Sequence, residues 1–194
     1  SIYYVVDGFK LYKYPNNNSL FTADPTKEIY DVAKRGNELY VLSRAGIFYS
    51  NTYGTSWQQT IDADTSLALF SSSSSRLVAS AHHLFLSKPG EALYRSGDNG
   101  VTWMRVFPAP GSGIYWSEKR LQADGDTLFY AEENISASVD FGQSWQPRAN
   151  IAGAKDLSFN ANEWYVASPV GAFRSPDRGF TWYAANGLVE ASEP

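Results

Sequence analysis

The stretch "SPDRGFTW", residues 175–182, places a serine, an aspartate, a glycine and a tryptophan in a fixed frame of eight residues. The frame recurs as "SGDNGVTW" at 96–103 and "SVDFGQSW" at 138–145, and a weaker copy, "SNTYGTSW", runs from 50 to 57. The four serines stand 46, 42 and 37 residues apart along the chain. A period near 40 residues is typical of one four-stranded propeller blade.

Short strand-like runs precede each frame. The last frame follows "KDLSF", "EWYVAS" and "GAFRS", and turn formers such as "NAN" separate these runs. No window shows a helical period of apolar residues. Runs such as "LYVL" at 39–42 are apolar at both odd and even positions, which indicates strands that are covered on both faces. The sequence therefore predicts an all-β fold, a β-propeller of four-stranded blades that forms a single domain over residues 1–194.

The chemistry inside the frame predicts a hairpin turn. A short carboxylate accepts hydrogen bonds from nearby backbone N–H groups, glycine adopts φ > 0 freely, and tryptophan begins the next strand and buries a large ring. Four copies of one active site would be unusual, whereas a repeat fold requires four copies of one turn, so we interpret Asp177 as structural. The same structural role is assigned to Ser50, Thr52, Gly54, Trp57, Ser96, Asp98, Gly100, Trp103, Ser138, Asp140, Gly142, Trp145, Ser175, Asp177, Gly179 and Trp182.

The pattern S-x-D-x-G-x-[TS]-W resembles the Asp-box, or BNR, repeat of sialidases, sortilin-type receptors, some glucanases and photosystem II assembly factors. The resemblance covers residues 29–184 and is weaker in the first frame, where Thr52 replaces the aspartate. It implies that each frame is the turn between the third and fourth strands of a propeller blade, on the face away from the ligand. Because the family contains enzymes, receptors and scaffolds, it indicates a fold and not an activity.

The two ends of the chain predict how the ring closes. Residues 1–28 resemble the second, third and fourth strands of a blade that lacks its first, and "GLVEA" at 187–191 has no blade of its own. Pairing the two ends gives five blades closed by the N- and C-terminal strands and removes exposed edges. The alternatives are an open arc completed by a second chain and a fragment of a longer propeller.

Composition excludes several classes of partner. The net charge is −4 with scattered lysines and arginines, which argues against nucleic acid. No apolar run approaches the roughly 18 residues of a membrane span. The chain starts on strand-like "SIYYVV", which suggests a removed leader or an excised domain, and it has no cysteine for disulfide or thiol chemistry. The family resemblance implies an extracytoplasmic protein, whether secreted, periplasmic or on the cell surface.

An enzyme needs catalytic residues of its own. Sialidases of this family use an arginine triad, a Tyr/Glu pair, an acid/base Asp and an F-R-I-P motif, which "FRSP" at 173–176 resembles. Arg174 directly precedes the serine of the frame, however, and so belongs to the third strand. The pairs Asp62/Asp64 and Glu132/Glu133 could act in glycoside hydrolysis, but acidic loop residues are usually solvated. We therefore expect no catalytic residues and no cofactor.

The leading function is a non-catalytic binding or protein-interaction module with a protein or glycan partner, and the alternative is a small, sialidase-related glycosidase. His82 and His83 are adjacent and point to opposite faces of a strand, so no metal site is expected.

One blade suggests where a partner binds. From the start of the second strand to the frame serine there are 11, 10 and 11 residues in three blades, but 19 from Leu77 to Ser96. This count predicts about eight extra residues in 82–91, which would form an extended hairpin on the face opposite the frames. The hairpin could be a contact site for a partner, or it could fold over the ring and bury Phe85. The aromatic pair in "GSGIYWSEKR" could likewise stack on a ligand or lie in the core. The candidate ligand-binding residues are His83, Leu84, Phe85, Lys88, Tyr115 and Trp116.

Overall fold

The computed structural model describes residues 3–7, 10–14, 18–22, 28–62, 75–88, 92–107, 121–131, 134–160 and 163–185 of the 194-residue chain. These residues form strands and turns without a helix, and thus without a helix that could cross a membrane. The strands build one three-stranded sheet and four four-stranded sheets. The all-β prediction is confirmed.

Each sheet is an antiparallel meander whose strands follow one another in sequence. The first sheet contains β1 (Tyr3–Asp7), β2 (Lys10–Tyr14) and β3 (Asn18–Thr22). The second and third sheets contain β4 (Ile29–Arg35), β5 (Glu38–Ser43), β6 (Gly46–Ser50) and β7 (Gln58–Asp62), then β8 (Arg76–Ala79), β9 (Leu84–Lys88), β10 (Ala92–Ser96) and β11 (Met104–Phe107). The fourth and fifth contain β12 (Leu121–Asp124), β13 (Thr127–Ala131), β14 (Ile135–Ser138) and β15 (Gln146–Ala149), then β16 (Asp156–Phe159), β17 (Trp164–Ser168), β18 (Gly171–Ser175) and β19 (Tyr183–Ala184).

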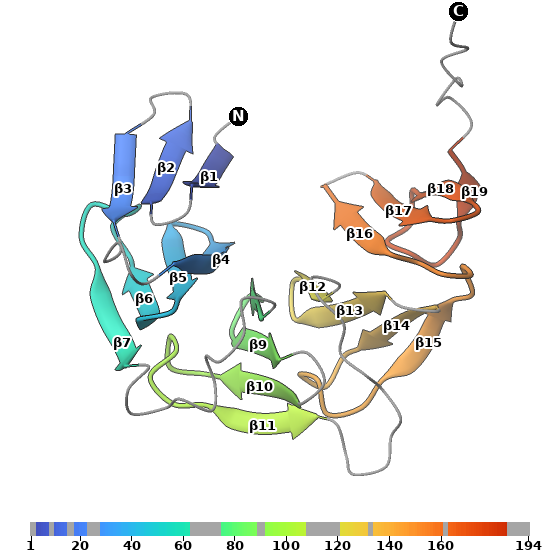
Figure 1. The fold of residues 1–194 in the computed structure, drawn as a ribbon. Helices are drawn as coiled ribbons and strands as arrows, with labels where there is room; N and C mark the ends of the chain where they lie inside the picture. Colours follow the sequence, from blue (N-terminus) through green and yellow to red (C-terminus); the bar gives the residue numbers. More distant parts are fainter. Residues whose placement is uncertain are drawn as a thin grey trace, which may run out of the picture.

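The sheets stand side by side in an arc, like the blades of a propeller (Figure 1). The first strands of the second, third and fourth sheets, β4, β8 and β12, contact one another in succession along the inside of the arc. The first and fifth sheets stand at its two ends (Figure 1). This propeller-like arrangement confirms the blade architecture that the repeat period predicts.

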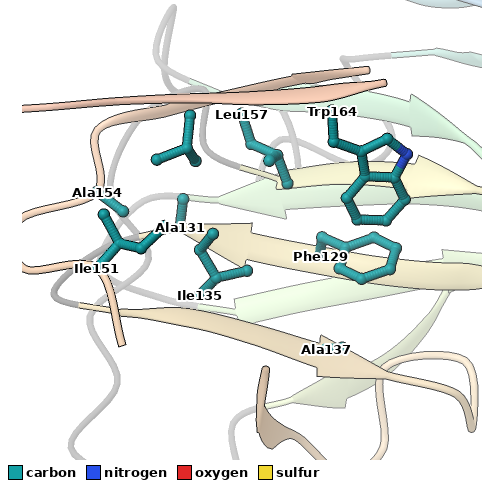
Figure 2. Close-up of a cluster of buried hydrophobic side chains, with 9 residues drawn as sticks. Phe129, Ala131, Ile135, Ala137, Ile151, Ala154, Leu157 and Trp164 are labelled. Carbon is teal, nitrogen blue, oxygen red and sulfur yellow. The ribbon is translucent and has the colours of Figure 1, made fainter. Parts of the chain in front are cut away.

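Four apolar clusters lie between consecutive sheets. They explain why the central strands are apolar at both odd and even positions. In β5, Val41 packs with Leu11 of the first sheet, whereas Tyr40 and Leu42 pack with Leu84 of the third sheet. The cluster between the fourth and fifth sheets is drawn in Figure 2, where the Phe129 ring meets the Trp164 ring edge to face at 4.4 Å. Burying a side chain of leucine or phenylalanine size contributes about 1.5 to 3 kcal/mol, so these clusters join the sheets.

The three-stranded first sheet matches the three strands predicted for residues 1–28. The C-terminal stretch at 187–191, which the prediction pairs with this sheet, lies outside the described residues. Closure into a five-bladed ring therefore stays a prediction.

The extra hairpin predicted in the third sheet is wrong. Leu77 lies in the first strand, β8, and the second strand, β9, begins at Leu84. Counted from Leu84, the distance to Ser96 is 12 residues, against 11 from Leu39 to Ser50. The error arose because "RLVA" at 76–79 is apolar at two successive positions, as a central strand is, although it forms the inner strand of this sheet.

Candidate functional site

The four repeated turns, residues 50–57, 96–103, 138–145 and 175–182, each connect the third and fourth strands of a sheet. In the third sheet, Asp98 Oδ1 accepts hydrogen bonds from Thr102 N at 2.8 Å and Ser96 Oγ at 2.7 Å, and its Oδ2 accepts one from Thr102 Oγ1 at 2.6 Å. Ser96 Oγ in turn accepts a hydrogen bond from Gly100 N at 2.9 Å. Asp140 and Asp177 make the same set of bonds in their turns. Each carboxylate is therefore occupied by its own turn.

Electrostatics keep these carboxylates ionised. Partial burial raises the pKa of Asp98 and Asp140, but hydrogen bonds from Thr102 and Ser144 outweigh it, so that both pKa values are lowered. The Thr181 hydroxyl and then its backbone N–H lower the pKa of Asp177 to about 2. A carboxyl group that stays ionised near neutral pH is a poor proton donor. The turns are thus suited to structure and unsuited to general acid catalysis.

The first turn has a weaker hydrogen-bond set, as its sequence suggests. Thr52 Oγ1 accepts a hydrogen bond from Ser56 N at 3.0 Å and lies 2.9 Å from Ser56 Oγ. A single hydroxyl thus replaces the two carboxylate oxygens. Gly54 N still donates to Ser50 Oγ at 2.9 Å.

The turn glycines have a second role that the sequence did not reveal. Gly142 has φ of 86°, and a Cβ there would lie 2.9 Å from Leu93 Cδ2 of the preceding sheet. The residue before each glycine is also left-handed, for example Asn99 with φ of 59°. The turn tryptophans donate Nε1 to the glycine carbonyl and pack into the cluster shared with the preceding sheet, as Trp103 does. The turns therefore join neighbouring sheets as well as strands.

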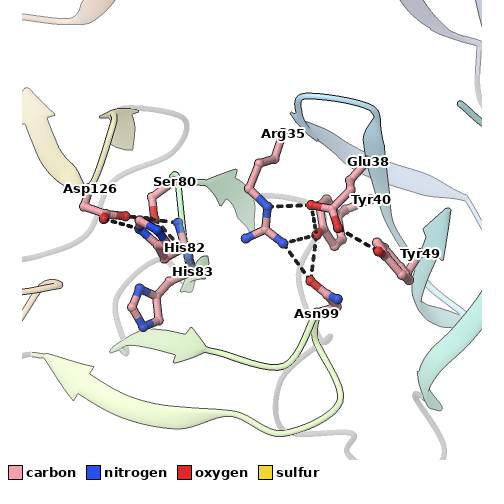
Figure 3. Close-up of polar contacts among 9 residues, drawn as sticks. All are labelled: Arg35, Glu38, Tyr40, Tyr49, Ser80, His82, His83, Asn99 and Asp126. Carbon is pink, nitrogen blue, oxygen red and sulfur yellow. Dashed lines mark hydrogen bonds and ion pairs between the residues drawn. The ribbon is translucent and has the colours of Figure 1, made fainter. Parts of the chain in front are cut away.

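A polar network links the second and third sheets (Figure 3). We call Arg35, Glu38, Tyr40 and Tyr49 the Glu38 network. Glu38 accepts hydrogen bonds from Arg35 Nε at 2.6 Å, Tyr49 OH at 2.7 Å and Tyr40 OH at 3.1 Å. Asn99 Oδ1 of the third sheet lies 2.7 Å from Arg35 Nη2 and 2.9 Å from Tyr40 OH.

The tyrosines of this network are held in the neutral form. Burial, and next the hydrogen bond to Glu38, raise the pKa of Tyr49 to about 12. Burial also raises the pKa of Tyr40. A tyrosine nucleophile requires the opposite shift. The Glu38 network therefore connects two sheets and is unsuited to nucleophilic catalysis.

A serine, a histidine and an aspartate meet between the third and fourth sheets (Figure 3). His82 Nδ1 contacts Asp126 Oδ2, but Ser80 Oγ donates to Asp126 Oδ1 at 3.0 Å rather than to the histidine. A catalytic triad needs the serine bonded to the histidine. His83 packs on the Phe141 ring at 4.6 Å, and burial followed by the Arg95 charge lowers its pKa. Among the described residues, no three potential ligand side chains cluster to hold a metal.

A cavity of about 340 Å³ lies where the first strands of the third, fourth and fifth sheets converge. Arg76 forms part of the cavity wall, and its Nη1 donates a hydrogen bond to Asp31 Oδ1 at 2.8 Å. Asp31 Oδ2 accepts a hydrogen bond from Leu77 N at 2.8 Å. Arg76 Nε is buried without a hydrogen-bond partner among the described residues. The residues that line this central cavity are Arg76, Gln122, Asp156, Leu157, Ser158 and Phe159.

Sequence reasoning missed this cavity, because its residues come from three strands that are far apart in the chain. One signal in the sequence could have indicated it. The first strands contain polar residues, namely Arg76, Gln122 and Asp156, whereas a strand that serves only core packing would be apolar. Asp156 is the one carboxylate among the lining residues.

The candidate ligand-binding residues do not form one site in the described part of the chain. Leu84, Phe85 and Lys88 are buried within β9, and His83 is half-buried at its start. Burial overturns the proposed contact role of Leu84 and Phe85, because a central strand presents no free surface. Tyr115 and Trp116 lie outside the described residues.

The four acidic candidates are likewise not assembled in the described residues. Asp62 ends β7, whereas Asp64, Glu132 and Glu133 lie outside them.

No protein-family model matches this sequence, and no curated protein sequence matches it. The fold is similar to a chain of the nidogen/laminin complex, with a TM-score of 0.69 and 14% identity over 95% of this chain and 78% of that chain. It is also similar to the GH74 enzyme of Niastella koreensis, with a TM-score of 0.64 and 15% identity over 96% and 29% of the two chains. YCF48 from Cyanidioschyzon merolae gives a TM-score of 0.56 and 12% identity over 80% and 55%.

At these identities the similarity establishes the fold alone. The present chain spans less than a third of the GH74 enzyme and about half of YCF48. The neighbours include a glycosidase and proteins of other kinds, and they favour neither the binding interpretation nor the enzymatic one.

Proposed function

We propose that this protein is a non-catalytic binding module that receives a polar segment of a partner protein in the central cavity. The supporting observation is Arg76, whose guanidinium is fixed by Asp31 while its buried Nε has no hydrogen-bond partner among the residues that the structure describes. An unsatisfied buried donor costs about 1 to 3 kcal/mol, and a ligand acceptor would recover this once the Arg76 side chain turns its Nε–H toward the cavity. Asp31 already balances the Arg76 charge, so a neutral acceptor such as a peptide carbonyl suits the site better than an anion.

The residues that line the central cavity also argue against glycoside hydrolysis. Glycoside hydrolysis uses two carboxyl groups about 5 to 10 Å apart. The lining residues of the cavity supply one carboxylate, Asp156, beside the Phe159 ring, Gln122 and Ser158. These groups could hydrogen-bond and pack against a peptide or a glycan, and we favour the peptide because the backbone offers both donors and acceptors.

The test combines a binding screen with a turnover assay. Immobilised peptide and glycan arrays are probed with the labelled domain, and hits are measured by calorimetry. Arg76→Lys retains the charge beside Asp31 but removes Nε–H, and we expect at least about tenfold weaker peptide binding with little change in melting temperature. Lys88→Arg, a buried cation outside the cavity wall, is the matched control. If the wild-type protein hydrolyses aryl glycosides and Asp156→Asn abolishes this activity, the proposal of a non-catalytic binding module is refuted.

The architecture forms part of the proposal. We assign the four repeated turns to the Asp-box family and the five sheets to the blades of a five-bladed propeller, whose ring residues 187–191 would close by pairing with the first sheet.

We further place the protein outside the cytoplasm, following the family resemblance. Fractionation of cells that carry the native gene tests this, and recovery in the cytoplasmic fraction would refute it.

A further inference from the structure

Asp156 is a charged group in the wall of the central cavity that the described chain leaves without an ion-pair partner. It is the first residue of β16, it is exposed, and it lines the cavity. None of the ion pairs between described residues includes Asp156. Lys155, the cation beside it in sequence, is not among the residues that line the cavity. The carboxylate is therefore available to a charged group of a ligand.

The other charged residue of the cavity wall is already balanced. Arg76 Nη1 donates a hydrogen bond to Asp31 Oδ1 at 2.8 Å, and the two side chains of this ion pair are only 25% and 12% exposed. Gln122, which is neutral, lines the cavity from the sheet that lies between those of Arg76 and Asp156. Because the charges of Arg76 and Asp31 cancel, the charge that remains in the wall is the negative charge of Asp156.

Ser158 places a hydroxyl on the same side of the strand as this carboxylate. Alternate residues of a strand point to the same side, so Asp156 and Ser158 share one side of β16, and both are exposed. Leu157 and Phe159 pack into the apolar cluster with the fourth sheet, where the Phe159 and Trp164 rings stack at 4.8 Å. Residues two apart are about 6.6 Å apart along a strand, so one ligand group with several donors can reach both side chains.

This pair of side chains suits a basic side chain better than a metal ion. The ammonium group of lysine has three N–H donors and the guanidinium group of arginine has five, whereas the Asp156 carboxylate and the Ser158 hydroxyl offer acceptors. Among the residues that the structure describes, no three potential ligand side chains cluster to hold a metal. The net charge of −4 on the whole chain adds a further attraction for a cationic segment.

We propose that the partner segment in the central cavity carries a lysine or arginine whose positive charge binds Asp156 and which also donates to Ser158. The inference rests on the proposed function, because it requires a peptide in the cavity. It divides recognition between two walls: Arg76 binds a backbone carbonyl, and Asp156 with Ser158 selects a side chain by its charge. Complementary charges across an interface contribute more to the choice of partner than to raw affinity.

A peptide series tests the charge preference. The probe is the array peptide that binds most tightly and that Arg76→Lys weakens, and we expect it to contain a lysine or an arginine. It is resynthesised with norleucine or glutamate in place of this basic residue, since norleucine keeps the aliphatic stem of lysine without its charge. Calorimetry at low salt should show that the basic form binds at least about fivefold more tightly than the norleucine form. High salt should reduce this ratio, because salt screens exposed charges.

Three variants locate the charge contact. Asp156→Asn keeps the shape of the side chain without its charge, so it should bind the basic and norleucine forms equally and still bind both. Asp156→Lys should reverse the preference and favour the glutamate form. Asp7→Asn, the same change at an exposed carboxylate of the first sheet that does not line the cavity, should behave like wild type.

The outcomes separate this inference from the proposed function. If the peptide that depends on Arg76 lacks a basic residue, or if its three forms bind equally to wild type, the inference is overturned while the binding module stands. A preference for the basic form that survives in Asp156→Asn overturns it in the same way. If Arg76→Lys weakens the binding of no array peptide, the proposed function fails and the inference fails with it.

Discussion

Gly142→Ala tests whether the turn glycines join neighbouring sheets or serve only the backbone of their turn. A residue with a Cβ at positive φ costs about 1 to 2 kcal/mol. At Gly142 the new Cβ would also lie 2.9 Å from Leu93 Cδ2 and 3.3 Å from Val106 Cγ2, both in the preceding sheet. Leu93 is fully buried, so it cannot move aside freely, and overpacking adds about 1 to 3 kcal/mol. We therefore expect a total loss of about 2 to 5 kcal/mol.

Gly125→Ala is the matched control. Gly125 has φ of 60°, but a Cβ there has nothing within 4 Å, so only the backbone cost of about 1 to 2 kcal/mol applies. Urea unfolding followed by tryptophan fluorescence measures both variants. In addition, Leu93→Ala should lower the free energy of unfolding less in the Gly142→Ala background than in the wild type. In that background, shortening Leu93 also removes the clash with the new Cβ at position 142. Equal losses for the two alanine variants would refute the role of the glycine between sheets.

Three further predictions concern the turn carboxylates. Asp140→Ala should cost about 1 to 3 kcal/mol in urea unfolding, because it leaves Ser144 N without its acceptor, and should leave ligand binding by the folded protein unchanged; unchanged stability with lost binding would give the turn a functional role. Thr52→Asp should stabilise the protein by about 0.5 to 1.5 kcal/mol, because a second oxygen can accept from the Ser56 backbone and hydroxyl together, and a lower urea midpoint would contradict this. The pKa of Asp177 falls from 3.8 to about 2 on folding, so its contribution to stability is present above pH 4 and is lost as the pH falls toward 2. Melting temperatures from pH 6 to 2 should therefore decline less steeply for Asp177→Asn than for wild type, and parallel curves would contradict the assignment.

The sequence predicted features that depend on local contacts. The Asp98 turn is held by hydrogen bonds between residues no more than four apart, so its eight-residue frame contains the information for its structure. The boundary between β8 and β9 was predicted wrongly, because Leu77 and Leu84 both begin apolar runs and only pairing across the sheet distinguishes an inner strand from a central one. The ion pair of Arg76 with Asp31 joins residues 45 apart in sequence, so no local pattern indicated the central cavity.

The position before the turn glycine shows how one repeated frame can distinguish different neighbours. The frame residues satisfy bonds within their own turn, whereas in the third, fourth and fifth sheets the side chain at this position contacts the preceding sheet and varies with what it meets there. The contacts pair Asn99 with Tyr40 and Arg35, Phe141 with His83 and Arg95, and Arg178 with Asp124. An amide thus meets hydroxyl and guanidinium donors, an aromatic ring meets an imidazole and a cation, and a cation meets a carboxylate. Exchanging two such residues would leave each turn intact but mismatch both contacts, so these pairs help to fix the order of the sheets along the arc.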